Sequence, residues 1–524
     1  MRIPIDRGSR VPVYRQIAGR LRQDIESGAL PARARLPATR ALAEELGVSR
    51  ITVVTAYAEL EDRGLVAARE GSGTYVAAGA AEPGRAGPAA EPSWPRWQRE
   101  LGPNPPPTPA PVGPRTEPPG GPGSGLPLGG PGPGLPPGGP GSMLPPGGPG
   151  PGPPGTLAFT GAGDPRLYPV AALARTIREV LHSDGPAALE YGGDPAGHRP
   201  LRETIVEVLA SQGLRTSAAQ VLVTTGSQQG LALAAQVLLR PGDAVVVEEP
   251  TYNLALDLFR AGGQRIVPVP VDRAGMQVDR LEPLLRTHHP RLLYTVPHFQ
   301  NPSGATLSGP RRTQLLALAD RYDVPVVEDD YVGDLRYEGR SPPALKALDT
   351  SGQVIYLGTF SKLLMPGVRV GYLVADGPVL DRLAEHKRVQ DVMTAPLMQR
   401  VLHRYVTVGR YQAHLRRTTR HYRRRRDALM AALRDQLPQV SAPTPAGGLF
   451  AWLTLPDGVS ARVLHEHARA AGVEVAPGGW FFADPAAGDR HLRLNFVVLT
   501  PDEIVEGVRR LATALDRYSV SGSW

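Results

Sequence analysis

A proline- and glycine-rich stretch in the middle of the chain constrains the fold more than any other feature. From residue 78 to residue 155 the sequence has almost no periodic apolar pattern, and a nine-residue near-repeat occurs three times within it. The repeat lacks the strict Gly-X-Y period of collagen, and a segment of this kind buries too little apolar surface to fold. The sequence therefore predicts a flexible linker at 78–155 between two folded units, 1–77 and 156–524.

Two tryptophans, Trp94 and Trp97, interrupt this linker. They either dock on a folded neighbour or form a loose aromatic cluster, and we expect the loose cluster. At roughly 5–6 Å × √n, a flexible linker of this length spans on the order of 50 Å on average. Such a linker would tether the two units without fixing the angle between them.

The composition excludes several classes of protein. The 524 residues contain no cysteine, which rules out disulfides, thiolate metal sites and cysteine nucleophiles, and we expect no metal site. The N-terminus lacks the apolar core of a signal peptide, and no run of about 18 apolar residues appears. We therefore expect a cytoplasmic protein without a membrane span. The net charge of +8 permits nucleic-acid binding but does not locate it.

The first 77 residues show the pattern of a helical domain followed by a hairpin. Apolar residues recur every four positions over 11–27 and predict an amphipathic helix. A second, short helix is expected before Gly47, and Ser49 is a good N-cap for a third. Two strands joined by Glu70-Gly71-Ser72 then read as a β-wing.

This segment, over residues 11–77, resembles the winged helix-turn-helix domain of the GntR family of bacterial repressors. The resemblance is carried by Tyr14-Arg15-Gln16-Ile17, Arg35-Leu36-Pro37, Arg40-Ala41-Leu42-Ala43, Leu46-Gly47-Val48-Ser49-Arg50, Thr52-Val53, Ala56-Tyr57, Leu60 and Gly71-Ser72-Gly73-Thr74-Tyr75-Val76. It implies that Arg40 and Arg50 contact double-stranded DNA and that the glycine wing enters the minor groove. Some relatives carry a further basic residue where this chain has Val54. The full set of expected DNA-binding residues is Arg35, Arg40, Ser49, Arg50, Thr52, Gly71 and Gly73.

Strands and helices alternate in the C-terminal part, 156–524. The expected strands lie at 221–224, 244–248, 265–269, 292–296, 324–328, 354–357 and 370–374, with helical stretches between most of them. This alternation predicts an α/β domain with a mostly parallel sheet, in which ligands bind beyond the carboxyl ends of the strands.

Lysine is rare in this chain, and one of its lysines, Lys362, stands in a position suited to chemistry. Among 58 Lys and Arg residues only Lys346, Lys362 and Lys387 are lysine. Arginine stays protonated, whereas a lysine amine can lose its proton and attack an aldehyde. Lys362 follows an apolar strand and precedes Arg369 by seven residues, which supplies an imine-forming amine and a fixed cation close together.

Polar groups follow three other strands as well. Gly226-Ser227-Gln228 opens a helix and resembles a phosphate site, Asn301 follows the strand at 292–296, and Asp329 follows the strand at 324–328. Each group alone has an ordinary explanation as a turn or a helix cap. Together with Lys362 they can bind a pyridine ring that carries a phosphate, a phenolic oxygen and an aldehyde.

Residues 156–524 resemble the fold-type I aminotransferases, which use pyridoxal 5′-phosphate (PLP), and Lys362 lies 33 residues after Asp329 as in that pattern. The resemblance implies a large domain with the mostly parallel sheet and a smaller α+β domain. The resemblance implies that Lys362 forms the Schiff base with PLP, that Asp329 pairs with the pyridine nitrogen, and that Asn301 and Tyr331 bind the phenolic oxygen. Lys362, Asp329 and Tyr331 are the expected catalytic residues. The expected cofactor-binding residues are Tyr191, Gly226, Ser227, Gln228, Tyr252, Asn301, Asp329, Tyr331, Thr359, Ser361, Lys362 and Arg369.

Three further features complete this half. Arg493 is expected to clamp a substrate carboxylate, since its fork matches two oxygens. Tyr191 resembles the tyrosine that reaches the phosphate of the partner subunit, which implies a homodimer. The arginine run at 423–426 lies on a long helix, and we expect a solvated helix face there rather than a DNA contact.

The combination of the two units resembles the MocR subfamily of bacterial transcriptional regulators. It implies a DNA-binding regulator that binds PLP covalently and senses an amino compound or PLP itself. The alternative is a working PLP-dependent aminotransferase that carries a DNA-binding domain, and a third hypothesis is a regulator whose C-terminal half is a scaffold without cofactor. The sequence leaves open the effector, the operator and the sign of regulation.

Overall fold

The computed structural model describes two separate compact units, one within residues 1–93 and one within 94–524. The described residues are 13–26, 30–31, 34–49, 52–54, 56–57, 60, 65–69, 73–76, 94–101, 155–161, 163–191 and 193–521. Among them, no helix is both long enough and apolar enough to cross a membrane. We call the two parts the N-terminal unit and the larger unit.

The N-terminal unit is the expected helical domain with a wing. It contains α1 (Val13–Glu26), α2 (Thr39–Leu46), helical residues at 52–54, 56–57 and 60, and the antiparallel strands β1 (Val66–Arg69) and β2 (Gly73–Val76). Gly47 ends α2 in the left-handed conformation that favours glycine. Apolar side chains from all these elements, such as Ile17, Leu42 and Val53, form one separate core.

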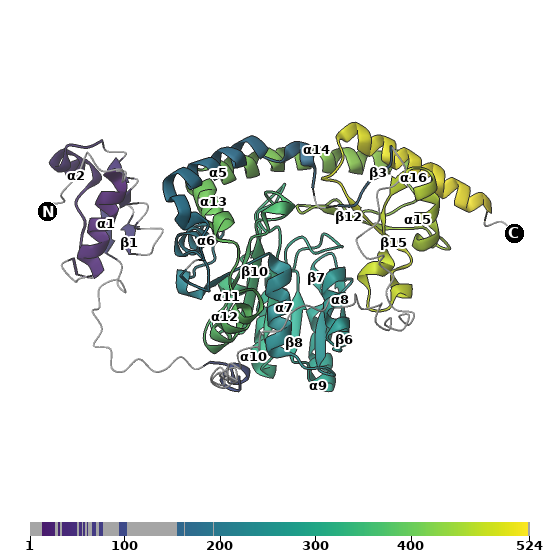
Figure 1. The fold of residues 1–524 in the computed structure, drawn as a ribbon, viewed down its shortest axis with the longest axis horizontal. Coiled ribbons are helices and arrows are strands. Elements are labelled where there is room, and N and C mark those ends of the chain that lie inside the picture. Colours follow the sequence, from purple (N-terminus) through teal and green to yellow (C-terminus); the bar gives the residue numbers. More distant parts are fainter. Residues whose placement is uncertain are drawn as a thin grey trace, which may run out of the picture. The chain divides into compact units, whose positions relative to one another are not determined.

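An eight-stranded sheet forms the centre of the larger unit, in the order β4-β11-β10-β9-β8-β5-β6-β7 (Figure 1). Its strands are β4 (Val221–Thr224), β5 (Ala244–Glu249), β6 (Arg265–Asp272), β7 (Gly275–Met276), β8 (Leu292–Thr295), β9 (Val326–Asp330), β10 (Val354–Thr359) and β11 (Gly371–Val374). β11 is antiparallel to both of its neighbours and β7 is antiparallel to β6, while β10, β9, β8, β5 and β6 run parallel. The predicted α/β class with a mostly parallel sheet is confirmed.

Helices cover both faces of this sheet, because its strands are apolar on both sides. Along β5, Val245 and Val247 enter one core while Ala244 and Val246 enter the other. The helices of the larger unit are α4 (Arg96–Arg99), α5 (Val170–Asp184), α6 (Arg199–Ser211), α7 (Ser227–Leu238), α8 (Asn253–Ala261), α9 (Leu281–His288), α10 (Gly309–Tyr322), α11 (Leu345–Leu348), α12 (Pro378–Asp391), α13 (Pro396–Thr407), α14 (Arg410–Gln436), α15 (Ala461–Ala470) and α16 (Pro501–Ser521).

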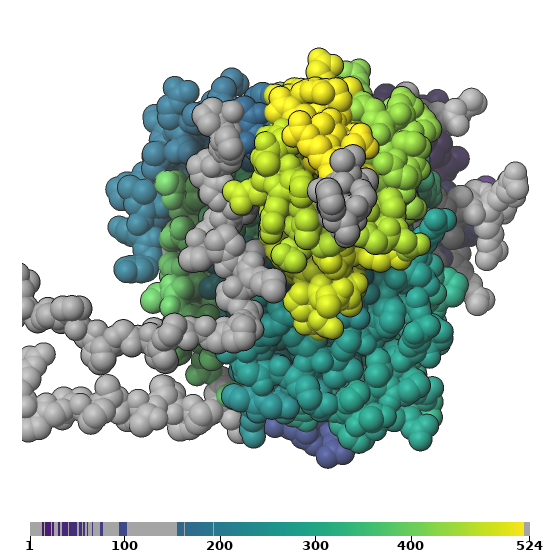
Figure 2. Space-filling model, turned by 90° about the vertical axis from the view of Figure 1, so that its right-hand side faces the viewer, coloured from purple at the N-terminus to yellow at the C-terminus, as the bar shows by residue number. Residues whose placement is uncertain are grey.

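A smaller C-terminal subdomain is built on a second sheet, with the strand order β12-β15-β14. The strands are β12 (Phe450–Thr454), β14 (Ala476–Pro477) and β15 (His491–Asn495), and β3 (Leu157–Ala158) pairs separately with β13 (Val473–Glu474). The long helix α14 extends along the larger unit from the side of α5 and α13 to α16 (Figure 1). Figure 2 shows the C-terminal segments, in yellow, above the teal segments that carry much of the central sheet.

Part of the expected linker is packed on the larger unit. Trp97 and Gln98 of α4 are buried, and the Trp97 indole N–H donates to Gln353 Oε1 at 2.7 Å. The expectation of a loose tryptophan cluster is therefore wrong. The rest of the expected linker, 78–93 and 102–154, lies outside the described residues.

The arginine run on α14 also differs from the expectation. Arg423 and Arg424 are exposed, but Arg425 and Arg426 are buried. Arg425 pairs with the buried Asp164, and Arg426 pairs with Glu338. The prediction of a solvated face is wrong for half of the run, because α14 turns these two side chains into the interior.

Candidate functional site

The third helix of the N-terminal unit begins as the sequence predicts. The Ser49 hydroxyl accepts the Thr52 backbone N–H at 3.2 Å, and the two hydroxyls lie 2.8 Å apart. Tyr57 donates its hydroxyl to the Pro37 carbonyl at 2.8 Å, which ties this helix to the turn before α2. These bonds fix the start of the helix on which base contacts are expected.

The wing is reinforced by the segment before α2. Leu36 donates its N–H to Thr74 and Val76 donates to Ala34, both at 2.8 Å, so this segment extends the hairpin. Arg35 is exposed beside the wing and Gly73 begins β2. Of the other expected DNA-binding residues, Ser49 and Thr52 are described, whereas the Arg40 side chain, Arg50 and Gly71 lie outside the described residues. Val54 is exposed.

In the larger unit, the expected polar groups follow strands that are near neighbours in the sheet. Gly226 follows β4, Asp329 lies near the carboxyl end of β9, Lys362 follows β10 and Asn301 follows β8. These strands stand in the order β4-β11-β10-β9-β8. Since β10, β9 and β8 are parallel, the fold gathers their carboxyl ends at one edge.

Asp329 is a buried carboxyl with one oxygen satisfied and one free. Its Oδ2 accepts the Tyr294 hydroxyl at 2.9 Å, while Oδ1 has no hydrogen-bond partner within the described part of the chain. Burial raises the pKa of Asp329 to about 7. An unpaired buried acceptor of this kind suits a cationic N–H donor, such as a protonated pyridine nitrogen.

Lys362 differs from the other two lysines of the chain. Lys346 pairs with Asp349 and Asp376, and Lys387 pairs with Asp391. Among the described residues, no carboxylate lies within ion-pair distance of Lys362. Burial, together with the nearby arginine cations, lowers the pKa of Lys362. A larger fraction of Lys362 is therefore in the neutral form, which attacks an aldehyde, than for a surface lysine at the same pH.

A cradle for an anion lies at the N-terminus of α7. Gly226 adopts φ 137°, and a Cβ atom there would come within 3.1 Å of the Arg369 guanidinium. The Ser361 hydroxyl and Gln228 Oε1 are buried without hydrogen-bond partners in the described structure. The Thr359 hydroxyl accepts the Ser361 N–H at 3.1 Å and holds the turn that precedes Lys362. A helix N-terminus, a guanidinium and an unpaired hydroxyl fit a phosphate.

Arg493 on β15 lies between two aromatic rings. Its guanidinium carbon is 4.3 Å from the Phe450 ring centre and 4.6 Å from that of Phe481. Its Nη1 donates to Asn301 Oδ1 at 2.9 Å, whereas Nε lacks a partner among the described residues. Burial lowers the pKa of Arg493 to about 10. A desolvated guanidinium with free donor capacity suits a carboxylate.

The expected tyrosines lie in different environments. The Tyr331 hydroxyl donates to the Phe299 carbonyl at 2.7 Å. To donate to a phenolic oxygen instead, the hydroxyl would have to rotate its hydrogen away from this carbonyl. Tyr252 is half-buried, and burial raises its pKa, with Asp329 as the next largest cause. Tyr191 is 84% exposed.

The residues expected from the sequence did not include two features of this site. Tyr294 lies within the apolar strand β8 yet binds Asp329, and its isolated hydroxyl in a buried strand was the available signal. Phe450 and Phe481, which flank Arg493, carried no such signal, because their approach depends on the packing of the C-terminal subdomain.

Comparisons with known proteins agree with both units. Residues 13–76 match the family of bacterial regulatory proteins named gntR, and residues 160–511 match the aminotransferase class I and II family. The solved structure of LysN, an α-aminoadipate aminotransferase from Thermus thermophilus, is 37% identical with a TM-score of 0.66. That similarity covers 70% of this chain and 94% of LysN.

Two transcriptional regulators are similar over nearly the whole chain. TauR of Rhodobacter capsulatus is 33% identical, covering 95% of this chain and 96% of TauR. The probable rhizopine catabolism regulatory protein MocR of Rhizobium meliloti is 30% identical, covering 99% of this chain and 97% of that protein. The fold and these relatives imply dependence on PLP. The chain belongs to the MocR subfamily of GntR-type transcriptional regulators, DNA-binding proteins in which a winged helix-turn-helix unit is joined to a fold-type I aminotransferase domain.

Proposed function

We propose that this regulator binds PLP covalently through Lys362 and that an amino compound, or PLP itself, controls its binding to operator DNA. The observation that carries this proposal is the unpaired, buried Oδ1 of Asp329 near a lysine without an ion-pair partner among the described residues. A buried polar atom without a partner costs on the order of 1–3 kcal/mol, and a bound ligand would remove that cost.

Each end of PLP has candidate partners in this site. Lys362 supplies the amine for the covalent bond, and Asp329 would accept a hydrogen bond from the pyridine nitrogen. Ser361, Arg369 and the N-terminus of α7, with Gly226, Ser227, Gln228 and Thr359, would hold the phosphate, while Asn301, Tyr331 and Tyr252 would contact the ring. When bound, PLP supplies an electron sink for reactions at an amino carbon.

The effector we propose is an amine that carries a carboxylate. Arg493 is desolvated, positioned by two rings and has an unsatisfied Nε in the described structure. The LysN structure contains N-(5'-phosphopyridoxyl)-L-leucine, a compound with such a carboxylate. An effector shifts operator binding only if it binds two states of the regulator with different affinity.

We also propose a homodimer in which Tyr191 contacts the partner subunit. The 84% exposure of this tyrosine leaves its ring available to a second copy. Two N-terminal units per dimer would then bind a pair of operator half-sites, with contacts from Arg35, Arg40, Ser49, Arg50, Thr52, Gly71 and Gly73.

The visible absorption spectrum of the purified protein tests the cofactor and the effector together. We expect an absorbance band from covalently bound PLP that Lys362→Ala abolishes, with Lys346→Arg, which keeps a cation beside Asp349 and Asp376, as a lysine control that retains it. Titration with amino acids and amines should shift the band, and the active compound should change the affinity for operator DNA in a fluorescence anisotropy assay. An identical spectrum for native protein and Lys362→Ala would refute the proposal.

The alternative function, a working aminotransferase with a DNA-binding unit, is favoured by the presence of every residue type needed for half-transamination. Adding a keto acid after the amino compound separates the two. Repeated turnover of amino donor and keto acid would establish the enzyme, whereas a spectral change that stops after amine binding and alters DNA affinity supports the sensor.

A further inference from the structure

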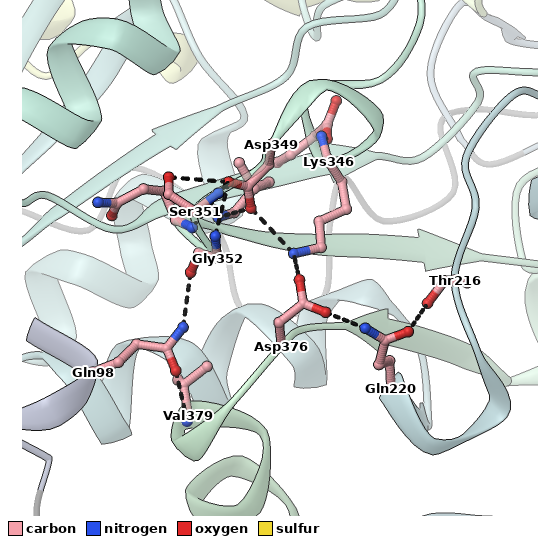
Figure 3. Close-up of polar contacts among 12 residues, drawn as sticks. Gln98, Thr216, Gln220, Lys346, Asp349, Ser351, Gly352, Asp376 and Val379 are labelled. Carbon is pink, nitrogen blue, oxygen red and sulfur yellow. Dashed lines mark hydrogen bonds and ion pairs between the residues drawn. The ribbon is translucent and has the colours of Figure 1, made fainter. Parts of the chain in front are cut away.

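The described segment 94–101 packs into a shaped site on the larger unit, although it lies inside the proline- and glycine-rich connection. Gln98, at 1% exposure, donates its amide to the Gly352 carbonyl at 2.8 Å and accepts the Val379 N–H at 3.2 Å (Figure 3). Trp97 is part of the main core and donates to Gln353. We call this segment the anchor.

Two glycines make room for the anchor. A Cβ atom on Gly377 would lie 2.7 Å from the Trp94 ring and 2.8 Å from Gln98 Oε1, and one on Gly352 would lie 3.2 Å from the same ring. Gly377 also has φ 74°, which disfavours any other residue. The surface of the larger unit is thus shaped to accept these two side chains.

The loop that receives the anchor is itself held by buried polar contacts. Asp349 Oδ1 accepts the N–H groups of Ser351, Gly352 and Gln353, and its Oδ2 binds Lys346 Nζ at 3.2 Å (Figure 3). Lys346 also pairs with Asp376. On the other side, Asp323 accepts the backbone N–H groups of Trp97 and Arg96 at the start of α4. Burial raises the pKa of Asp323, and these hydrogen bonds offset only part of that effect.

The anchor lies at the end of the sheet opposite to the candidate cofactor site. Its partners Asp323 and Gln353 stand just before β9 and β10, whereas Asp329 and Lys362 lie at the other ends of these strands. The anchor therefore contacts none of the residues proposed to bind PLP, and it is separate from that function.

We propose that the anchor is a built-in clamp that divides the connection into a short tether and a separate loop. The tether, 77–93, has 17 residues between the wing and the anchor, and the loop, 102–154, has 53 residues. At no more than about 3.6 Å per residue, the tether can reach at most about 60 Å, against about 280 Å for the undivided connection. The clamp would thereby shorten the chain that joins the N-terminal unit to the larger unit.

This shortening changes the effective concentration of the N-terminal unit around its own larger unit. Effective concentration falls roughly as the −3/2 power of linker length. Releasing the anchor lengthens the tether from 17 to 78 residues and would lower the effective concentration of the N-terminal unit around its own larger unit about tenfold.

Limited digestion of the native chain with trypsin tests the clamp directly. Arg85 and Arg115 flank the anchor, while Arg96 and Arg99 lie on it. We expect cleavage after Arg96 and Arg99 to be at least about tenfold slower than after the flanking arginines, because a packed helix must open before cleavage. Equal rates at all four sites in the native protein would overturn the proposal.

Release variants extend the test. Trp97→Ala with Gln98→Ala should bring cleavage at Arg96 and Arg99 to the rate of the flanking sites, and Arg99→Ala, an exposed change on the same helix, should leave protection at Arg96 intact. Trypsin protection of the rest of the larger unit serves as the readout of folding, and Gln98→Ala alone is the milder variant.

The reach of the tether can be measured because the chain has no cysteine of its own. Labels on Glu44→Cys and Arg388→Cys, both at exposed positions, report the distance between the units when the labelled chain is diluted into unlabelled protein. The double release variant should give a longer and broader distance distribution than the native chain. An unchanged distribution would show that the anchor does not set the reach.

Discussion

At the scale of single residues, the three lysines show how environment separates chemistry from structure. Lys346 and Lys387 each form an ion pair with a carboxylate. Lys362 has arginines nearby and a lowered pKa. The scarcity of lysine in the sequence singled out all three equally, and the place of Lys362 after a strand and before Arg369 favoured it. The fold adds that the other two have carboxylate partners, whereas Lys362 has none within ion-pair distance among the described residues.

The carboxyl of Asp329 should make the stability of the cofactor-free protein depend on pH. Its folded pKa of about 7 is raised above the usual value near 4, so the folded state holds a proton that the unfolded state has lost. Stability from this group is therefore present below about pH 4 and is lost as pH rises to about 7. At about 1.4 kcal/mol per pKa unit, the loss between pH 5 and pH 8 is on the order of 2–3 kcal/mol.

Asp329→Asn isolates this effect, since an amide does not titrate. In urea unfolding of cofactor-free protein, the difference in unfolding free energy between variant and native protein should grow in favour of the variant from pH 5 to pH 8. PLP should bind the variant more weakly, because the amide cannot stabilise a pyridinium charge. Parallel pH profiles for the two proteins would contradict the argument.

At the scale of elements, helix α14 places neighbouring arginines in opposite environments. Arg425 is buried against Asp164, which is 1% exposed and also binds Arg166. Removing one partner of a buried pair leaves an uncompensated charge, at a cost of about 3–5 kcal/mol. Arg425→Leu should destabilise the larger unit by about that amount, whereas Arg424→Leu, at an exposed position, should change stability by less than about 0.5 kcal/mol. Equal midpoints in urea unfolding would show that Asp164 needs no second arginine.

The close approach of β11 to the start of α7 should matter for the cofactor. A Cβ atom on Gly371 would lie 2.7 Å from the backbone of Gly226 and 2.9 Å from the Gly358 carbonyl, neither of which can rotate away. Gly371→Ala should therefore displace the candidate phosphate cradle and cost about 1–3 kcal/mol of stability.

The matched control is Gly367→Ala, where an added Cβ meets nothing within 4 Å. PLP affinity, measured by absorbance titration, should fall for Gly371→Ala and stay unchanged for Gly367→Ala. An unchanged affinity in both variants would place the phosphate elsewhere.

The sequence predicted the elements whose signal is local. The seven strands expected from apolar runs all exist in the central sheet, and the third helix begins at its predicted cap, Ser49. It could not predict the antiparallel direction of β11, because short apolar strands read the same in either direction. It also misjudged Trp97, whose partner Gln353 lies more than 250 residues away, and a four-residue helix has no stability apart from such contacts.

The candidate site was predictable to the extent that it lies at strand ends. Asp329, Lys362 and Asn301 follow predicted strands, and the fold gathers the ends of those strands. The rings around Arg493 were not predictable, since Phe450 and Phe481 reach it from separate parts of the C-terminal subdomain. The roles of Asp329, Lys362 and Asn301 with PLP stay predictions.

At the scale of the whole molecule, the two units have separate hydrophobic cores. The N-terminal core contains residues from α1, α2, the third helix and the wing, whereas the clusters of the larger unit draw on residues from 97 onward. A short chain segment buries less of its surface than a long one and is correspondingly less stable. The units should therefore unfold independently, with the N-terminal unit first.

Differential scanning calorimetry of the full chain should accordingly show two transitions. Leu42→Ala, at a fully buried position of the N-terminal core, should lower the first transition by the equivalent of about 2–5 kcal/mol and leave the second in place. PLP at about 100 times its dissociation constant should stabilise the second by about 2.7 kcal/mol and leave the first in place, because the proposed PLP site lies in the larger unit. A single transition moved by both changes would contradict the argument, because it would mean that the two units unfold together.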